Sequence, residues 1–200
     1  MRTPWQPLLD WWFGSAVTAA EVAAARAGLW FGKQDSQDNQ ARERFSEQVE
    51  LALSGDLADW MVEPEGWLAL VLLLDQLPRM ISRDTPRAFA GDRRAQQLVR
   101  EGLAQGRAAA LTPIQRVFIY LVLEHAEDLP SQVEAVARFA ALRADAHAAE
   151  DQLFADYLDY AERHRRVIAR FGRFPHRNSI LGRVSTAEEV SFLQEPGSRF

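Results

Sequence analysis

The sequence predicts an all-α fold of stacked antiparallel helix hairpins, and three observations support this class. Apolar residues recur at the spacing of one helix face over long segments of the chain. Several segments begin with proline, or with serine or threonine followed three residues later by glutamate or glutamine, which are helix start signals. Alternating or β-branched runs bounded by turns, which would indicate strands, are missing. Helices joined by short links pack as antiparallel neighbours, which gives the hairpin stack. A chain of 200 residues of which nearly half are hydrophobic fits a single domain over residues 1–200.

The first part of the chain is expected to hold three helices. A short one is predicted over Pro7 to Phe13, where Gly14 stops it. The alanine-rich segment that follows is weakly patterned, and we place one helix there at Ala19 to Ala27. From Ser36 the pattern is clear, because apolar residues fall at helical spacing up to Gly55, the expected C-terminal stop.

Pro64 opens the helix that we expect at the centre of the fold. This helix is apolar all round from Trp67 to Leu74, and a helix of this kind is buried. The apolar run then ends abruptly in a polar group that contains Asp75, Gln76 and Arg79. The predicted core helix therefore ends in charged side chains that need partners.

A second apolar helix is predicted to end in the same way. After a helix that Asp92 is expected to cap, Thr112 and Gln115 form a capping box around a proline at the first helical position. The helix that begins there carries a long apolar run and then becomes polar. The polar residues at its end are Glu124, His125, Glu127 and Asp128. Two buried helices thus present similar polar clusters.

Two long helices and one short helix complete the prediction. Ser131 with Glu134 is expected to cap a helix through about Ala146, and a further helix is predicted from about Glu150 to Phe171. A last short helix, which ends near Leu193, has the capping pair Ser185 and Glu188.

Composition excludes several classes of protein. The chain has 200 residues, no cysteine and a net charge of −5. The lack of cysteine excludes disulfides, thiolate nucleophiles and sulfur-ligated metals, and the acidic balance argues against general nucleic-acid binding. The longest apolar run, Trp67 to Leu74, is far shorter than the roughly 20 residues that cross a bilayer. Residues 1–20 lack the pattern of a secretory signal, so we expect a cytoplasmic protein without membrane partners.

The stretch from Tyr160 to Arg183 differs from the rest of the chain. It holds seven arginines and two histidines among large apolar residues, and Glu162 is its only acid. Its apolar side chains favour burial, and buried guanidiniums need acceptors. We therefore expect this stretch to dock against carboxylates from elsewhere in the chain, or to bind a ligand.

Short motifs along nearly the whole chain resemble a bacterial family of uncharacterised proteins, the domain of unknown function 924. They are Trp12-Phe13-Gly14, Leu29-Trp30-Phe31-Gly32, Arg44-Phe45, Leu74-Asp75-Gln76 with Arg79, Ala88-Phe89, Glu124-His125 with Glu127-Asp128, Arg170 through Asn178, Leu181 through Arg183, and Ser185-Thr186. The resemblance implies a tetratricopeptide-like helical fold, of the α-solenoid type, and no established activity.

The candidate site joins the acids at the two helix ends with the basic C-terminal stretch. The catalytic candidates are His125, His164 and His176, and the ligand-binding candidates are Asp75, Arg79, Glu124, Asp128, Arg170, Arg173, Arg177, Asn178 and Arg183. Three interpretations of this cluster stay open. It is a structural ion-pair network, or a site for an anionic small molecule or a peptide end, or the centre of a hydrolase or phosphoryl-transfer enzyme that uses a histidine–carboxylate pair.

Other partners are not expected from the sequence. No phosphate-cradling glycine loop and no nucleophile motif is visible, and we expect no cofactor. Carboxylate–histidine pairs at helical spacing are common by chance, so we expect no metal site. Arginines between phenylalanines could bind RNA, although aromatic residues at helical spacing are usually core residues. The oligomeric state is open.

Overall fold

The computed structural model describes residues 3–198, and this part of the chain is helical without strands. The α-helices are α1 (Gln6–Phe13), α2 (Ala19–Trp30), α3 (Asp35–Ser54), α4 (Pro64–Ile81), α5 (Asp92–Ala104), α6 (Pro113–Glu124), α7 (Leu129–Ala144), α8 (Asp151–Phe171) and α9 (Ala187–Phe192). Short 3-10 helices are η1 (Ala58–Val62), η2 (Pro86–Phe89), η3 (Arg107–Ala110), η4 (Ala148–Glu150) and η5 (Pro175–Arg177). The predicted all-α class is confirmed.

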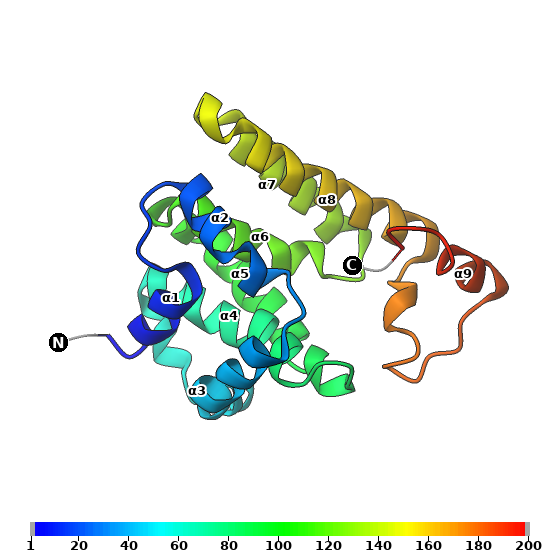
Figure 1. Cartoon of the computed structure of the whole chain (residues 1–200), viewed down its shortest axis with the longest axis horizontal. Helices are drawn as coiled ribbons and strands as arrows, with labels where there is room; N and C mark the ends of the chain where they lie inside the picture. Colours follow the sequence, from blue (N-terminus) through cyan, green and yellow to red (C-terminus); the bar gives the residue numbers. More distant parts are fainter. Residues whose placement is uncertain (1–2, 199–200) are drawn as a thin grey trace.

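Helix α4 lies at the centre of the molecule and packs against α3, α5 and α6 (Figure 1). Every residue from Gly66 to Pro78 is buried, as expected for a helix that is apolar on all sides. Among the described helices, none is both long and apolar enough to cross a membrane.

A close backbone approach places the start of α5 beside the end of α4. A Cβ atom at Gly91 would lie 2.1 Å from the carbonyl oxygen of Leu74, so only glycine fits there without a shift. Pro78 has no N–H, and this carbonyl therefore lacks its usual helical partner. The approach brings Asp92 next to the polar end of α4. Asp92, which we predicted as the cap of α5, is instead its first residue.

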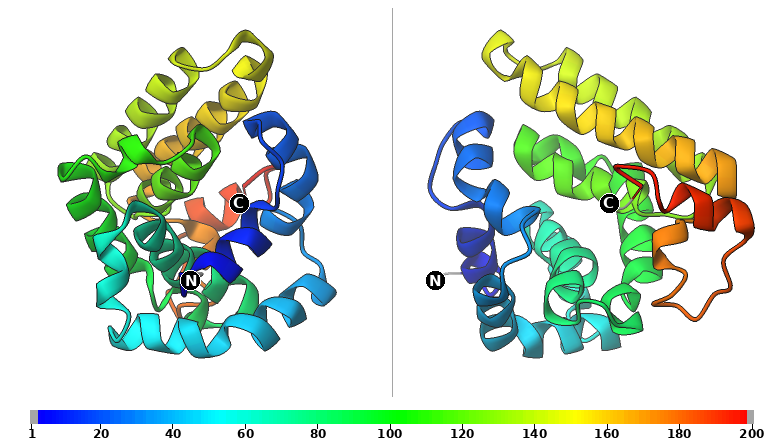
Figure 2. Two further views of the ribbon diagram at one scale, coloured as in Figure 1. Left: turned by 90° about the vertical axis from the view of Figure 1, so that its left-hand side faces the viewer. Right: turned by 45° about the vertical axis from the view of Figure 1, so that its right-hand side comes forward.

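Helices α7 and α8 form a long antiparallel hairpin along one side of the molecule (Figures 1 and 2). After Phe171 the chain turns back toward the helix ends through residues 172–186, which we call the C-terminal segment, and reaches α9. Val167, Ile168 and Phe174 form a small second core there, separate from the main one.

Two helix starts differ from the prediction. Asp128, not Ser131, caps α7, because its carboxylate accepts a hydrogen bond from the Ser131 N–H at 2.8 Å. Thr186, not Ser185, caps α9. The sequence contains two overlapping matches to the capping box, and the one that forms lets Glu189 bond back to the Thr186 N–H at 2.7 Å.

Candidate functional site

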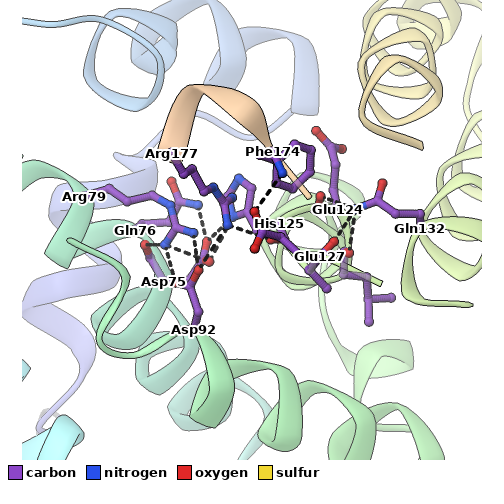
Figure 3. A network of polar contacts seen from close by, with 12 residues as sticks. Asp75, Gln76, Arg79, Asp92, Glu124, His125, Glu127, Gln132, Phe174 and Arg177 are labelled. Carbon is purple, nitrogen blue, oxygen red and sulfur yellow. Dashed lines mark hydrogen bonds and ion pairs between the residues drawn. The ribbon is translucent and has the colours of Figure 1, made fainter. Parts of the chain in front are cut away.

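The polar end of α4 lies in one network with the start of α5 and the end of α6 (Figure 3). The carboxylate of Asp75 is 3.1 Å from Nη1 of Arg79 and accepts a hydrogen bond from Gln76 at 2.6 Å. Arg79 also donates to both oxygens of Asp92, at 2.9 and 3.0 Å. Burial raises the pKa of Asp75, but Arg79 and His125 outweigh it and hold that pKa well below its ordinary value. Asp75 is therefore a buried, ionised carboxylate.

His125 follows the last residue of α6 and directs its ring at Asp75. Its Nδ1 lies 2.9 and 3.0 Å from the two carboxylate oxygens. An ionised carboxylate only accepts hydrogen bonds, so Nδ1 carries the proton. Burial, helped by the positive charges of Arg79 and Arg177, lowers the pKa of His125 in spite of Asp75. The imidazole is therefore neutral at pH 7, and its Nε2 is an acceptor.

Arg177 comes from η5 of the C-terminal segment and enters the same network. Its guanidinium stacks on the rings of Phe89 and Phe174, at 5.0 and 4.5 Å from their centroids. Nη1 donates to the carbonyl oxygen of His125 at 3.1 Å, and Asp92 lies 3.6 Å away. Burial and then Arg79 lower the pKa of Arg177 to about 10, so it stays charged.

A second carboxylate–imidazole pair lies beside the first. Nδ1 of His164 on α8 is 2.9 Å from Oε1 of Glu124 and 2.9 Å from the carbonyl oxygen of Tyr160. Both side chains are buried, with 6% of His164 and 2% of Glu124 exposed. The ring centroids of His125 and His164 are 6.4 Å apart. The structure therefore brings the candidates His125, His164 and Glu124 together.

The carbonyl groups at the end of α6 are bonded by side chains. Nε2 of the fully buried Gln132 donates to the carbonyl oxygens of Glu124 and Ala126, at 2.6 and 2.8 Å, while Arg177 bonds that of His125. These bonds satisfy acceptors that a helix end leaves free. They fix the backbone that carries both Glu124 and His125.

Glu127 attaches the C-terminal segment to the helices. It accepts two hydrogen bonds from Arg183, at 2.6 and 2.9 Å, and one from the Phe174 N–H at 2.7 Å. Burial opposes its ionisation, but these bonds lower its pKa. Asn178, which is 1% exposed, accepts a bond from Arg183 at 2.9 Å. Asn178 and Arg183 thus hold the loop that follows η5.

Other candidates have partners outside the network around Asp75. Arg173 binds both oxygens of Glu189, at 2.6 and 2.7 Å, and this lowers the pKa of Glu189 to about 2. Arg170 forms an exposed pair with Glu188 at 2.8 Å. Asp128 caps α7 and lies 3.6 Å from Arg100. These side chains position helices rather than converge on His125.

His176 lies at the edge of the same region. Its ring centroid is 5.7 Å from that of Phe174. Burial, followed by the charge of Arg177 and the proximity of His164, lowers the pKa of His176 to about 3. This histidine is therefore neutral at pH 7.

Several residues that bond the candidate side chains were not themselves among the sequence candidates. They include Asp92, Phe89 and Gln132 in the network around Asp75, and Glu189, which pairs with Arg173 outside it. Asp92 and Glu189 carry helix start signals, which concealed their ion pairs. Phe89 lies in one of the family motifs, but the sequence does not show which side chain it contacts, and Gln132 has no signal, since both contacts depend on tertiary packing.

Two hollows in the described part of the molecule lie away from the network. One of about 190 Å³ is lined by residues of α1 and α3 with Trp60 and Leu73, and a wider, open one of about 800 Å³ lies near the tip of the α7–α8 hairpin. Within the described residues, no group of three or more acids and histidines is arranged to hold a metal ion. Neither of these two hollows is lined by a residue of the network around Asp75.

The family of bacterial proteins of unknown function DUF924 matches residues 8–197. The chain belongs to this family. A solved structure, of a protein of unknown function from Agrobacterium tumefaciens, is similar to this DUF924 chain with a TM-score of 0.73 and 36% identity. The similarity covers 88% of this chain and 99% of the other. No curated protein matches significantly.

Proposed function

We propose that this DUF924 protein binds an anionic small molecule or the carboxylate end of a peptide, and that Arg177 and His125 hold it. One observation carries the proposal. Arg177 is 6% exposed, yet its Nε has no hydrogen-bond partner among the described residues. Buried donors are normally paired, and guanidinium donors match the oxygens of a carboxylate or phosphate. An anion would supply the missing acceptors.

The proposed site uses fewer arginines than the sequence candidates include. Arg170, Arg173 and Arg183 each pair with a carboxylate at 2.6 to 2.8 Å. Arg177 is 3.6 Å from Asp92, and its Nε has no hydrogen bond among the described residues, so we propose that this donor is left for a ligand. The side chain of His125 is 17% exposed, and we infer that a ligand enters along this open edge. We propose that this binding takes place in the cytoplasm, a location with which the lack of cysteine agrees.

Binding can be tested by calorimetric titration with phosphate and with a short peptide, compared with the same peptide amidated at its C-terminus. We expect binding of a free carboxylate or phosphate in the wild type, its loss in Arg177→Gln and its retention in the control Arg170→Gln. Unfolding temperatures of all three proteins accompany the titrations. Failure of every anion to bind the wild type, with a loss of stability in Arg177→Gln, would leave only the structural network.

A second function, hydrolysis of a phosphate or acyl ester, is favoured by the Asp75–His125 pair. A neutral imidazole oriented by a buried carboxylate is the arrangement of a general base, and Arg177 would stabilise developing negative charge. A panel of phosphate and acyl esters tests this idea with wild type and His125→Ala. Turnover that disappears in the variant supports it, and turnover that survives assigns the activity to another group.

A further inference from the structure

We propose that the hollow between α1 and α3 is a second binding site, and that it takes a small aromatic carboxylate, a single ring that bears one carboxylate group. The hollow contains Arg44-Phe45, a motif of the sequence that has no part in the network around Asp75. The inference goes beyond the proposed function, because α1 and α3 lie on the opposite side of the molecule from the C-terminal segment, which carries Arg177 (Figures 1 and 2).

The size and walls of the hollow suit a single ring. It has a volume of about 190 Å³ and lies between the start of α1, one face of α3, η1 and the middle of α4. The residues around it are Pro4, Pro7, Leu8, Arg44, Phe45, Gln48, Trp60 and Leu73. An apolar cavity of roughly 150 Å³ holds one benzene ring, and sites for drug-sized ligands have roughly 300–1,000 Å³. The hollow therefore has room for one ring with a short substituent.

The charge of the hollow comes from one side chain at its open side. Of the residues that the structure places around the hollow, Arg44 alone is charged. Arg44 is exposed, whereas Phe45, Trp60 and Leu73 are buried. A ligand that fits this arrangement has an apolar body and one anionic end that stays near the solvent.

Arg44 has donors left for such an anion. Its guanidinium lies over the rings of Trp11 and Phe45, 5.7 and 5.0 Å from their centroids. This stacking orients a guanidinium and leaves its N–H groups free. Among the described residues, Arg44 forms no ion pair or hydrogen bond, whereas Asp38 of the same helix is bound by Arg83 at 2.7 and 2.8 Å. The unpaired positive charge therefore favours a carboxylate over a neutral ligand.

Gln48 is a second polar side chain in the wall. It lies four residues after Arg44, so the two side chains share one face of α3. Its Oε1 is buried and has no hydrogen-bond partner among the described residues, although buried acceptors are normally paired. A hydrocarbon in this hollow would leave both side chains without a partner, whereas a carboxylate binds the guanidinium. The wall therefore favours a polar ligand over a purely apolar one.

The inference is tested with benzoate and with two analogues that each lack one part of it. Acetate has the carboxylate without the ring, and benzamide has the ring without the charge. We expect benzoate to bind the wild type at least about fivefold more tightly than either, the factor that corresponds to a good exposed ion pair. NMR spectra of the protein locate the site, since the indole N–H signal of Trp60, assigned with Trp60→Phe, should shift when benzoate is added.

A pair of arginine variants tests the role of the charge. Arg44→Gln should lower the affinity for benzoate to that for benzamide, because the charge is removed and the apolar walls remain. Arg138→Gln is the matched control, since Arg138 is on α7, away from the hollow, and this variant should bind benzoate as the wild type does. Circular dichroism spectra and unfolding temperatures show whether both variants are folded.

The outcomes separate this site from the one proposed at Arg177. If benzoate shifts the Trp60 signal and depends on Arg44, while phosphate and peptide carboxylates do not bind, the aromatic carboxylate site stands and the proposed function fails. If benzoate binding is lost in Arg177→Gln and kept in Arg44→Gln, the inference is overturned and the anion site at Arg177 is supported. Equal binding of benzoate and benzamide, or a Trp60 signal that does not move, also overturns the inference.

Discussion

Oδ1 of Asp75 and Nδ1 of His125 lie 2.9 Å apart although the two residues are separated by fifty positions in the chain. The contact joins the ends of α4 and α6, the two apolar helices whose polar ends stand out in the sequence. It is the centre from which the other ion pairs extend, through Arg79 to Asp92 and from His125 to Arg177. Its removal should therefore affect stability strongly.

The change Asp75→Asn is expected to lower the free energy of unfolding by about 3 kcal/mol, because it removes one partner of a buried charged pair and leaves Arg79 less compensated. Urea denaturation measures the change. The control Glu134→Gln alters an exposed pair on one helix, with Arg138, and should cost less than about 1 kcal/mol. Equal effects of the two substitutions would contradict the central role of Asp75.

Stability should decrease as the pH falls from 6.5 toward 3. The pKa of His176 is lowered from 6.5 to about 3, so below pH 6.5 the unfolded chain binds a proton that the folded chain does not. Glu189, with its pKa lowered from 4.5 to about 2 by Arg173, contributes stability above pH 4.5 that is lost as the pH falls toward 2. Unfolding temperatures across this range test both effects.

The variant His176→Gln tests whether His176 causes the loss of stability between pH 6.5 and 4.5. His176→Gln cannot titrate, so it should show a flatter loss of stability between pH 6.5 and 4.5 than the wild type. The remaining slope belongs to His125, whose pKa is also lowered. An unchanged slope in His176→Gln would show that this histidine is accessible to protons in the folded state.

The glycine at the start of α5 should not tolerate a side chain. In Gly91→Ala the new Cβ would meet the Leu74 carbonyl oxygen at 2.1 Å, so the backbone must shift, at a cost of about 1–3 kcal/mol. Gly28→Ala is the matched control. Gly28 lies within α2, and the nearest atom to a Cβ built there is 3.9 Å away, so alanine should stabilise the helix slightly. Thermal unfolding of both variants decides the point.

The attachment of the C-terminal segment should depend on Glu127. Glu127→Ala removes three hydrogen bonds to a charged acceptor and should cost about 2 kcal/mol or more. Hydrogen exchange should rise in residues 172–186 and stay unchanged in α4. The exposed pair of Arg170 and Glu188 provides the control, because Arg170→Ala should leave exchange in this segment nearly unaltered.

Much of the fold was accessible from the sequence because its signals are local. The burial of α4 follows from an unbroken apolar run, and Thr112 with Gln115 forms the predicted capping box. Asp75, His125 and Arg177 were identified as candidates, since charged residues at the ends of buried helices need partners. Their pairing was not predicted in detail, because it depends on how α4, the end of α6 and the C-terminal segment pack together.

The sequence also could not predict which partner each arginine of the C-terminal segment would contact. Arg173 and Arg177 are four positions apart and look alike in the sequence, yet one binds Glu189 and the other lies between two phenylalanine rings. That difference arises from the turn at Gly172, where φ is +68°, and from the position of α9. A single sequence contains no signal for such long-range geometry.

The small core of Val167, Ile168 and Phe174 is separate from the main core. Cooperative unfolding units often follow such boundaries. We therefore expect residues 172–186 to detach in partial unfolding while α4 and its neighbours remain folded. In that intermediate, Arg177 would move away from His125 together with the C-terminal segment, and water would reach Asp75. The protein would keep its architecture and lose the network around Asp75, so mild denaturing conditions should disrupt the candidate site before they unfold the helices.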